Sequence, residues 1–258
     1  IAPVLVGPQA RIRATAAAAG LDLAAWSILD TPHSHASAER AVALVREGSV
    51  AALMKGSLHT DELLAAALAR EAGLRTERRV SHCFVMDAPL YPRLLIITDA
   101  AINIAPDLEA KADIVRNAIR LATAIGIDLP RVALLSAVET VTPKLVSTLD
   151  AAALCKMAER GQIMGGVLDG PLAFDNAVSE AAARSKGIVS AVAGRADILV
   201  VPDIESGNML AKQLAYLGGA EGAGIALGLR VPVALTSRSD DATSRLASAA
   251  LLRLMAGG

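Results

Sequence analysis

Short apolar runs alternate with helix-like segments along almost the whole 258-residue chain. The clearest case is the apolar run 231–235, followed by polar residues and then by apolar residues on one helical face at 246–251. The run predicts a buried strand, and the spacing predicts a helix over 241–255 with Ser239 or Asp240 as its N-cap. Strands that alternate with helices favour parallel pairing through crossovers. The pattern therefore predicts an α/β fold with one or two parallel, doubly wound sheets.

The same pattern places the other elements of this fold. Further strands are expected at residues 1–6, 26–29, 50–54, 83–86, 94–98, 131–135, 165–168, 198–201 and 225–227. Further helices are expected at residues 9–19, 38–47, 60–71, 108–125, 143–157 and 209–217, with one more ending at residue 186. Glycine or proline marks the end of several of them.

The composition excludes several classes of function. Aromatic residues make up 2% of the chain, charged residues 20%, and the formal net charge is −1. Because Lys and Arg are scattered, no basic stripe supports nucleic-acid binding, and a phosphate site must be local. No apolar run reaches membrane-spanning length and no signal peptide is visible, so we expect a cytoplasmic protein without membrane contact. Cys83 and Cys155 lack the spacing of a metal site or redox pair, and we expect two buried thiols in a reducing compartment.

Polar residues follow the apolar run 231–235, where a strand would lead into a helix. Ser237 and Arg238 lie at this junction, with Asp240 and Asp241 close behind. Ligands of open α/β folds bind at such strand ends, helped by free helix amides and the helix dipole. A hydroxyl, a guanidinium and an acid suit a substrate that carries phosphate and a reacting carbonyl. An ordinary capped connection with a solvated Arg238 would give the same pattern.

A second junction of this kind follows the strand expected at 50–54. It carries Lys55, Ser57, His59 and Thr60, and we expect Thr60 to cap the next helix. These side chains form either a second wall of an anion site or an ordinary capped turn.

Acidic residues gather in two further loops that we expect at strand ends. They are Asp169, Asp175 and Asn176 in one loop and Asp203, Glu205 and Asn208 in the other. Such residues hold a divalent cation or supply a general base, but they also serve as helix caps.

His33 and His35 lack a third ligand nearby, so we expect both to be solvated. The glycine motif at 222–224 precedes a strand instead of following one, which argues against a dinucleotide site.

Seven segments of the sequence resemble one known family. They are MKGSLHT (54–60), GLRTERRVSH (73–82), TDAAINIAPDL (98–108), TLDAAALCKMAERGQI (148–163), LDGPLAFDNAVS (168–179), AGRADILVVPDIESGNML (193–210) and LTSRSD (235–240). Taken in order over nearly the whole chain, they are similar to the phosphate acetyl/butyryltransferase family, most closely to its butyryl-type branch.

The resemblance implies two doubly wound α/β domains with a cleft between them, as in the isocitrate/isopropylmalate-dehydrogenase-like fold. Residues 1–126 plus 229–258 would form the first domain, and residues 127–228 would form a second, inserted domain. Family members usually have one more βα unit before the segment that matches Ile1, so we expect that an N-terminal unit is missing. Some relatives are fused behind a hydratase-like domain, and this chain is a candidate fragment of such a fusion.

The implied reaction is the reversible transfer of an acetyl or butyryl group between coenzyme A and inorganic phosphate. Coenzyme A is a substrate, and the resemblance implies neither a bound cofactor nor a metal. Ser237 would donate to the oxyanion or thiol, and Arg238 would hold the phosphate through a bidentate fork. Asp240 or Asp241 would be the general base. The residues expected to bind substrate are Lys55, Gly56, Ser57, His59, Thr60, Asp203, Glu205, Gly207 and Asn208. We also expect a homodimer or higher homo-oligomer.

Three positions depart from the pattern of acetyl-type relatives. Those enzymes usually have their acid further into the helix, near Ser244, and they carry arginines at the positions that align with Ala65 and Tyr216. The loss of two anion ligands puts acetyl-phosphate specificity in doubt and fits the butyryl-type branch, whose acyl pocket is larger. If Ala65 and Tyr216 line a buried apolar pocket, each added methylene would contribute up to about 0.8 kcal/mol and favour butyryl-CoA.

Two rival functions fit part of the sequence. An oxidative decarboxylase of the same fold needs a metal-binding Asp cluster and a nucleotide loop, which the sequence does not supply. A non-catalytic acyl-CoA or phosphate-binding domain of a larger fusion enzyme would explain the two missing arginines, but not the presence of Ser237 beside Arg238.

Overall fold

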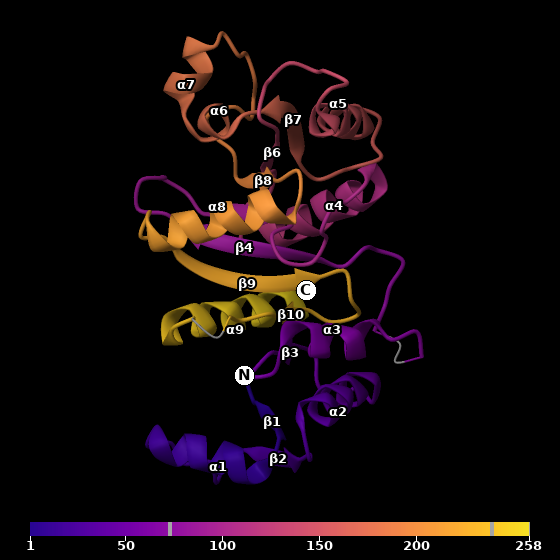
Figure 1. Ribbon diagram of the computed structural model, residues 1–258, viewed down its shortest axis with the longest axis vertical. Helices are drawn as coiled ribbons and strands as arrows, with labels where there is room; N and C mark the ends of the chain where they lie inside the picture. Colours follow the sequence, from indigo (N-terminus) through magenta and orange to yellow (C-terminus); the bar gives the residue numbers. More distant parts are fainter. Residues whose placement is uncertain (72–73, 238–239, 258) are drawn as a thin grey trace.

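A mixed sheet runs through the molecule and joins most of its elements (Figure 1). The computed structural model describes residues 1–71, 74–237 and 240–257. Their strands are β1 (Val4–Gly7), β2 (Ser27–Asp30), β3 (Leu53–Met54), β4 (Ser81–Asp87), β5 (Leu95–Thr98), β6 (Arg131–Leu135), β7 (Val167–Leu172), β8 (Ile198–Val200), β9 (Glu221–Leu227) and β10 (Val233–Ala234). Eight of them follow the order β3-β10-β9-β4-β5-β8-β6-β7, while β1 and β2 form a separate two-stranded sheet at one end of the elongated molecule.

Three neighbouring pairs of these described strands are antiparallel, which corrects the prediction of purely parallel sheets. They are β4 with β5, β4 with β9, and β9 with β10, whereas the other pairs are parallel. For two of these pairs, β4 with β5 and β9 with β10, the physical reason lies in the connections. Residues 88–94 and 228–232 contain no helix, and a short connection without a crossover lets the chain reverse direction.

The helices are α1 (Gln9–Ala18), α2 (Ser34–Arg46), α3 (Thr60–Leu68), α4 (Leu108–Ala124), α5 (Val146–Glu159), α6 (Phe174–Val178), α7 (Glu180–Ser185), α8 (Ile204–Tyr216) and α9 (Ala242–Ala256). Helix α8 begins five residues earlier than expected, because the Asp203 carboxylate accepts a hydrogen bond from Ser206 N at 2.9 Å. Strand β7 is longer than expected and includes Asp169, which therefore does not lie in a loop.

The N-cap of α9 also differs from the prediction. Asp241 is the cap, and its Oδ1 accepts a hydrogen bond from Ser244 N at 2.8 Å. Asp240 is therefore not the cap, because its Oδ2 accepts from Ser237 N instead. Ser239, the other predicted cap, lies outside the described residues.

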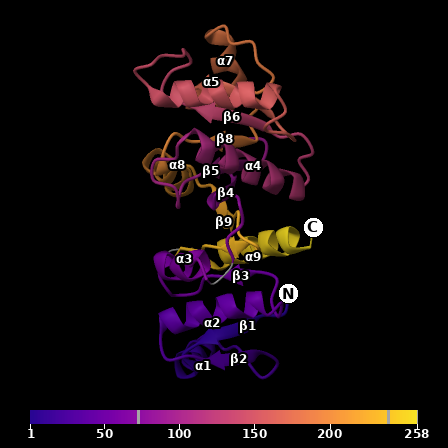
Figure 2. The same ribbon diagram turned by 90° about the vertical axis from the view of Figure 1, so that its right-hand side faces the viewer.

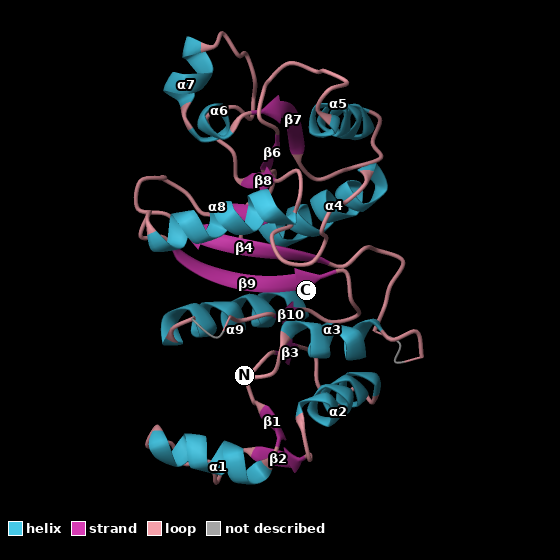
Figure 3. Ribbon diagram, viewed as in Figure 1, coloured by secondary structure: helices cyan, strands magenta, loops and turns pink. Residues whose placement is uncertain are grey.

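Helices cover both faces of the eight-stranded sheet (Figures 2 and 3). One core lies under α4, α5 and α9, and a second core lies under α6, α7 and α8 on the opposite face. Successive residues of β5 alternate between these cores: Ile96 packs in the first, and Leu95 and Ile97 pack in the second. A third core joins α2 and α3 to β3 and β10. None of the described helices combines the length and apolarity needed to span a membrane.

The predicted division into two domains concerns residues 127–228. Their strands, β6 to β9, belong to the same sheet as β3, β4, β5 and β10. Domain boundaries after residue 126 and after residue 228 therefore stay a prediction.

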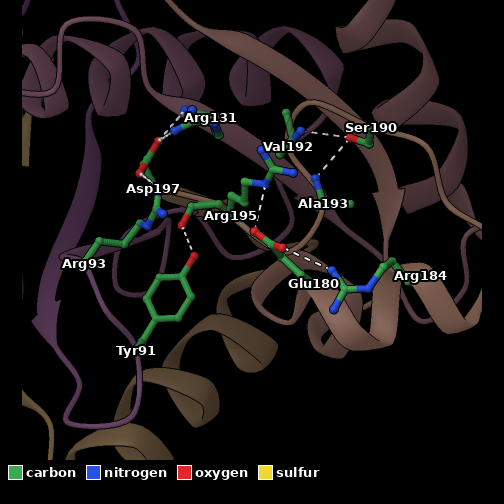
Figure 4. A network of polar contacts seen from close by, with 11 residues as sticks. Tyr91, Arg93, Arg131, Glu180, Arg184, Ser190, Val192, Ala193, Arg195 and Asp197 are labelled. Carbon is green, nitrogen blue, oxygen red and sulfur yellow. Dashed lines mark hydrogen bonds and ion pairs between the residues drawn. The ribbon is translucent and has the colours of Figure 1, made fainter.

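A buried carboxylate holds together the beginnings of β6 and β8 (Figure 4). The Asp197 side chain is 5% exposed and lies within 3.5 Å of Arg93 Nη1 and 3.6 Å of Arg131 Nη1. Its Oδ2 also accepts a hydrogen bond from Arg131 N at 2.8 Å. Tyr91 closes the cluster by donating to the Ala196 carbonyl at 2.6 Å, and burial raises the pKa of Tyr91 to about 12. Asp197 therefore compensates two guanidinium groups and one backbone N–H.

We expect Asp197→Ala to lower the free energy of unfolding by about 2–4 kcal/mol, because it leaves that N–H and both guanidinium groups without their carboxylate. Glu180→Ala is a matched control. Glu180 also pairs with two arginines, Arg184 and Arg195 (Figure 4), but its side chain is 47% exposed. The control should cost less than about 1 kcal/mol. Urea unfolding followed by circular dichroism measures both values, and equal losses would contradict the prediction.

Candidate functional site at the ends of β3 and β10

The two predicted junctions lie side by side because β3 and β10 are parallel neighbours. Leu53 N donates to Pro232 O at 3.1 Å, and Lys55 N donates to Ala234 O at 2.9 Å. Beyond the strands, the buried Thr236 Oγ1 donates to Lys55 O at 2.8 Å. Parallel neighbours end at the same edge of a sheet. The segments 55–60 and 235–241 are far apart in the sequence. They therefore both leave the sheet at the same edge, side by side.

Lys55 is buried, with 4% of its surface exposed. Its Nζ donates to Leu58 O at 3.2 Å and lies 3.4 Å from Gly56 O. A buried ammonium group is costly unless acceptors surround it. These carbonyl contacts fold the turn 55–58 around the Lys55 side chain, while Ser57 is exposed to solvent.

Helix α3 is capped by His59, which corrects the prediction of Thr60. The His59 backbone is extended and Thr60 is the first helical residue. Glu62 Oε2 accepts from His59 N at 2.8 Å, and its Oε1 accepts from Ser34 Oγ at 2.6 Å. The Ser34 hydroxyl, followed by the His59 N–H, lowers the pKa of Glu62. This carboxylate thus ties the beginning of α2 to the beginning of α3.

The residues before α9 form a turn of their own. Ser237 N donates to Asp240 Oδ2 at 2.7 Å. Arg245, in the first turns of α9, donates from Nη2 to Ser237 O at 2.9 Å and from Nε to Asp240 O at 3.1 Å. The side chain of Ser237 is exposed, and Arg238 lies outside the described residues. Sequence reasoning missed Arg245, because only the folded turn brings the two carbonyls to its guanidinium.

Asp240 and Asp241 have different surroundings. The Asp241 carboxylate caps α9, and the Ser244 N–H and hydroxyl lower its pKa. Asp240 instead bonds to the backbone of Ser237 and lies beside the strand-end segment. The structure therefore separates a helix cap from an acid that contacts the candidate site.

A second group of predicted residues lies at the beginning of α8 and contacts the loop after β5. A Cβ added at Gly207 would lie 3.0 Å from Asp99 O, and Asn208 Nδ2 donates to Ala100 O at 3.2 Å. Asp203 caps α8 and Glu205 is exposed. In the part of the chain that the structure describes, no hydrogen bond or ion pair joins this group to the segments 55–60 or 235–241.

The loop after β5 is held by a buried carboxylate that sequence reasoning did not single out. Asp99 accepts hydrogen bonds from the backbone of Ala101 and Ile102 at 2.9 and 3.0 Å. Asn103 Nδ2 donates to Asp99 Oδ2 at 2.6 Å, while Asn103 Oδ1 accepts from Arg79 Nε at 2.7 Å. Hydrogen bonds within the loop and to Arg79 therefore hold it in place, and the beginning of α8 packs against it.

A lysine pairs with two acidic residues near β7, Glu139 and Asp175. Lys186 Nζ lies 2.6 Å from Glu139 Oε1 and 3.0 Å from Asp175 Oδ2, and Lys186 lowers the pKa of both carboxyl groups. Asn176 Nδ2 also bonds to Glu139. Among residues 1–71, 74–237 and 240–257, no group of three His, Cys, Asp or Glu side chains could hold a metal ion. His33 caps α2 and His35 lies 3.1 Å from Glu62, and both are solvent-exposed as expected.

Two expectations about burial need correction. Ala65 is exposed and Tyr216 is 71% exposed, so the assumption that they line a buried apolar pocket is wrong. Both lie on the outer sides of α3 and α8, where no core cluster covers them. Cys83 is buried as expected, whereas Cys155 is half-buried, and burial raises the pKa of both thiols to about 12.

Known proteins resemble this chain over almost its full length. A family model described as "Phosphate acetyl/butaryl transferase" matches residues 35–252. A phosphate acetyltransferase of Rhizobium meliloti is 64% identical over 99% of this chain and 81% of its own length. A phosphate butyryltransferase of Clostridium acetobutylicum is 45% identical over 98% of this chain and 84% of its own length.

Solved structures support the same relationship. A branched-chain phosphotransacylase from Enterococcus faecalis V583 is 30% identical, with a TM-score of 0.84 over 99% of each chain. A 4-hydroxythreonine-4-phosphate dehydrogenase from Klebsiella pneumoniae, 17% identical with a TM-score of 0.56 over 98% of this chain and 90% of its own, shares the fold alone, as expected for a dehydrogenase-like fold. These phosphate acyltransferases carry the names of different acyl groups, so they do not decide between acetyl and butyryl. The chain belongs to the phosphate acetyl/butyryltransferase family.

Proposed function

We propose that this protein transfers a short acyl group reversibly between coenzyme A and inorganic phosphate. The observation that carries the proposal is the bond from Thr236 Oγ1 to Lys55 O, which joins two polar strand-to-helix junctions in a member of this family. Helices α3 and α9 both begin beside these junctions. Their N-terminal dipoles favour anions, such as phosphate and the oxyanion of an acyl-transfer intermediate.

The proposed chemistry begins with the thiol of coenzyme A. Asp240 takes the thiol proton, and the thiolate attacks the carbonyl carbon of the acyl phosphate. The C–S bond forms, and the bond from that carbon to the phosphate oxygen then breaks, which releases phosphate. Ser237 donates to the developing oxyanion, and Arg238 holds the phosphate. In the reverse direction phosphate attacks the thioester, and Asp240 returns the proton to the departing thiolate.

The other proposed substrate contacts fall into the two groups of the described structure. Lys55, Gly56, Ser57, His59 and Thr60 are proposed to form the phosphate side, because they surround the beginning of α3. Asp203, Glu205, Gly207 and Asn208 are proposed to contact coenzyme A from the beginning of α8. We also propose a cytoplasmic homo-oligomer that binds coenzyme A as a substrate and no separate cofactor. These proposals rest on the family resemblance and the composition.

Thiol release from acetyl-CoA and butyryl-CoA, with and without phosphate, tests the proposed reaction. We expect release that depends on phosphate, and the ratio of kcat/KM values identifies the preferred acyl group. Arg238→Lys should raise the KM for phosphate and lower kcat, together by about tenfold or more in kcat/KM, because an ammonium group cannot reproduce a bidentate fork. Acyl-CoA binding without thiol release would contradict catalysis and support a non-catalytic binding domain.

Asn substitutions at the two acids test which of them is the base. Asp240→Asn should lower kcat by about a hundredfold, because the amide oxygen can still accept from Ser237 N but cannot take a proton. Asp241→Asn is the matched control. Asn is as good an N-cap as Asp, so this variant should keep both its stability and its kcat. If kcat stays near wild type in Asp240→Asn and falls in Asp241→Asn, the assignment of Asp240 as the general base is wrong.

A further inference from the structure

His82 is a buried imidazole with no assigned role. It lies in β4, is 1% exposed, and meets the ring of Phe84 edge-on with centroids 4.4 Å apart. On β9, a Cβ added at Gly224 would lie 2.9 Å from His82 Nε2 and 3.5 Å from Leu235 O. The imidazole and the Leu235 carbonyl oxygen therefore both lie close to the position that a Cβ on Gly224 would occupy. His82 therefore lies beneath the backbone that leads into Ser237.

The ring nitrogens of His82 lack hydrogen-bond partners in the structure. Neither Nδ1 nor Nε2 bonds to any group in residues 1–71, 74–237 or 240–257. Burying polar atoms without partners costs free energy. A Leu or Phe side chain would fill the same space without that cost, so packing alone does not explain an imidazole at this position.

Two carboxylates act on the imidazole from different loops. Asp99 lies in the loop after β5, and Asp240 lies in the turn before α9. Burial lowers the pKa of His82 to about 4, and both carboxylates oppose this shift. Phe84 and Gly224, which also lie against the ring, carry no charge. At neutral pH the ring is therefore neutral and has one N–H donor and one acceptor nitrogen.

We propose that His82 is a positioning residue for acyl transfer: when substrates bind, its N–H donates to the Leu235 carbonyl or the Asp240 carboxylate and holds Ser237 and Asp240 in their reactive arrangement. This inference rests on the proposed function. Because the imidazole is buried beneath the turn, it acts through the turn and does not touch the substrate. A shift of about 1 Å in reacting groups lowers rates by about a hundredfold, so a loosened turn would affect kcat more than KM.

The first test compares variants at position 82 in the thiol-release assay. His82→Leu should lower kcat by about tenfold or more, while the KM values for phosphate and coenzyme A change less than about threefold. His82→Gln and His82→Asn each restore one hydrogen-bonding nitrogen, and one of them should recover part of kcat. Phe84→Leu is the matched control for lost packing and should keep most of kcat. Wild-type kcat in His82→Leu would overturn the proposal.

The pH profile separates positioning from proton transfer. Since the ring stays neutral well above pH 4, the kcat profile of His82→Gln should keep the wild-type shape above about pH 5.5. Loss of a wild-type ionisation step from the His82→Gln profile in that range would show that His82 moves a proton and would overturn a purely positioning role.

A second measurement uses the unmodified protein, in case the Leu variant does not fold. Nitrogen NMR of ¹⁵N-histidine-labelled protein reports hydrogen bonds to each ring nitrogen. Phosphate and coenzyme A together should shift one His82 nitrogen signal toward its hydrogen-bonded value. Unchanged His82 signals at saturating substrate would overturn the inference. Failure of the proposed function is distinguishable, because the wild-type protein would then release no thiol with any acyl-CoA.

Discussion

The hydrogen bond from Thr236 to the carbonyl of Lys55 joins residues that are 181 positions apart in the sequence. It continues the parallel pairing of β3 with β10, and both strands are only two residues long. Such short strands give little pairing energy by themselves, so the core formed by α2, α3, β3 and β10 must hold them in register. The candidate site depends on this register. Only when β3 and β10 are aligned in this way do the beginnings of α3 and α9 lie close enough to contact one ligand.

Three polar side chains near this register, the buried Lys55 and Asp99 and the half-buried Arg245, each fix a different loop or turn. Lys55 folds one turn around its ammonium group, Arg245 fixes the other turn through two carbonyls, and Asp99 closes the loop on which α8 rests. Each is compensated by local backbone groups. His82 is different, because its nitrogens have no partner within the described residues and two carboxylates, Asp99 and Asp240, act on it electrostatically. Asp240 in the turn before α9 and Asp99 in the loop after β5 both raise the pKa of this one side chain.

Much of the fold was predictable from apolar spacing, since β6 and α4 lie where the pattern put them, to within one residue. The antiparallel strands β4 and β9 were not, because a short apolar run looks the same in either direction. At the site, both junctions were predictable from the sequence. The N-cap of α9 was not, because the choice among neighbouring polar residues depends on the backbone angles at Asp241. The expected burial of Tyr216 failed because a helical position does not reveal which side the core covers.

Hydrogen–deuterium exchange in the presence of phosphate and coenzyme A tests most directly whether the two junctions form one site. Ligand binding at a shared site should slow amide exchange in residues 55–63 and 235–245 together, and strand β6 should stay unchanged as an internal reference. Because helix N-terminal amides bind anions directly, phosphate alone should give part of this protection in both segments. Protection of only one segment, or protection confined to residues 203–208, would contradict the account.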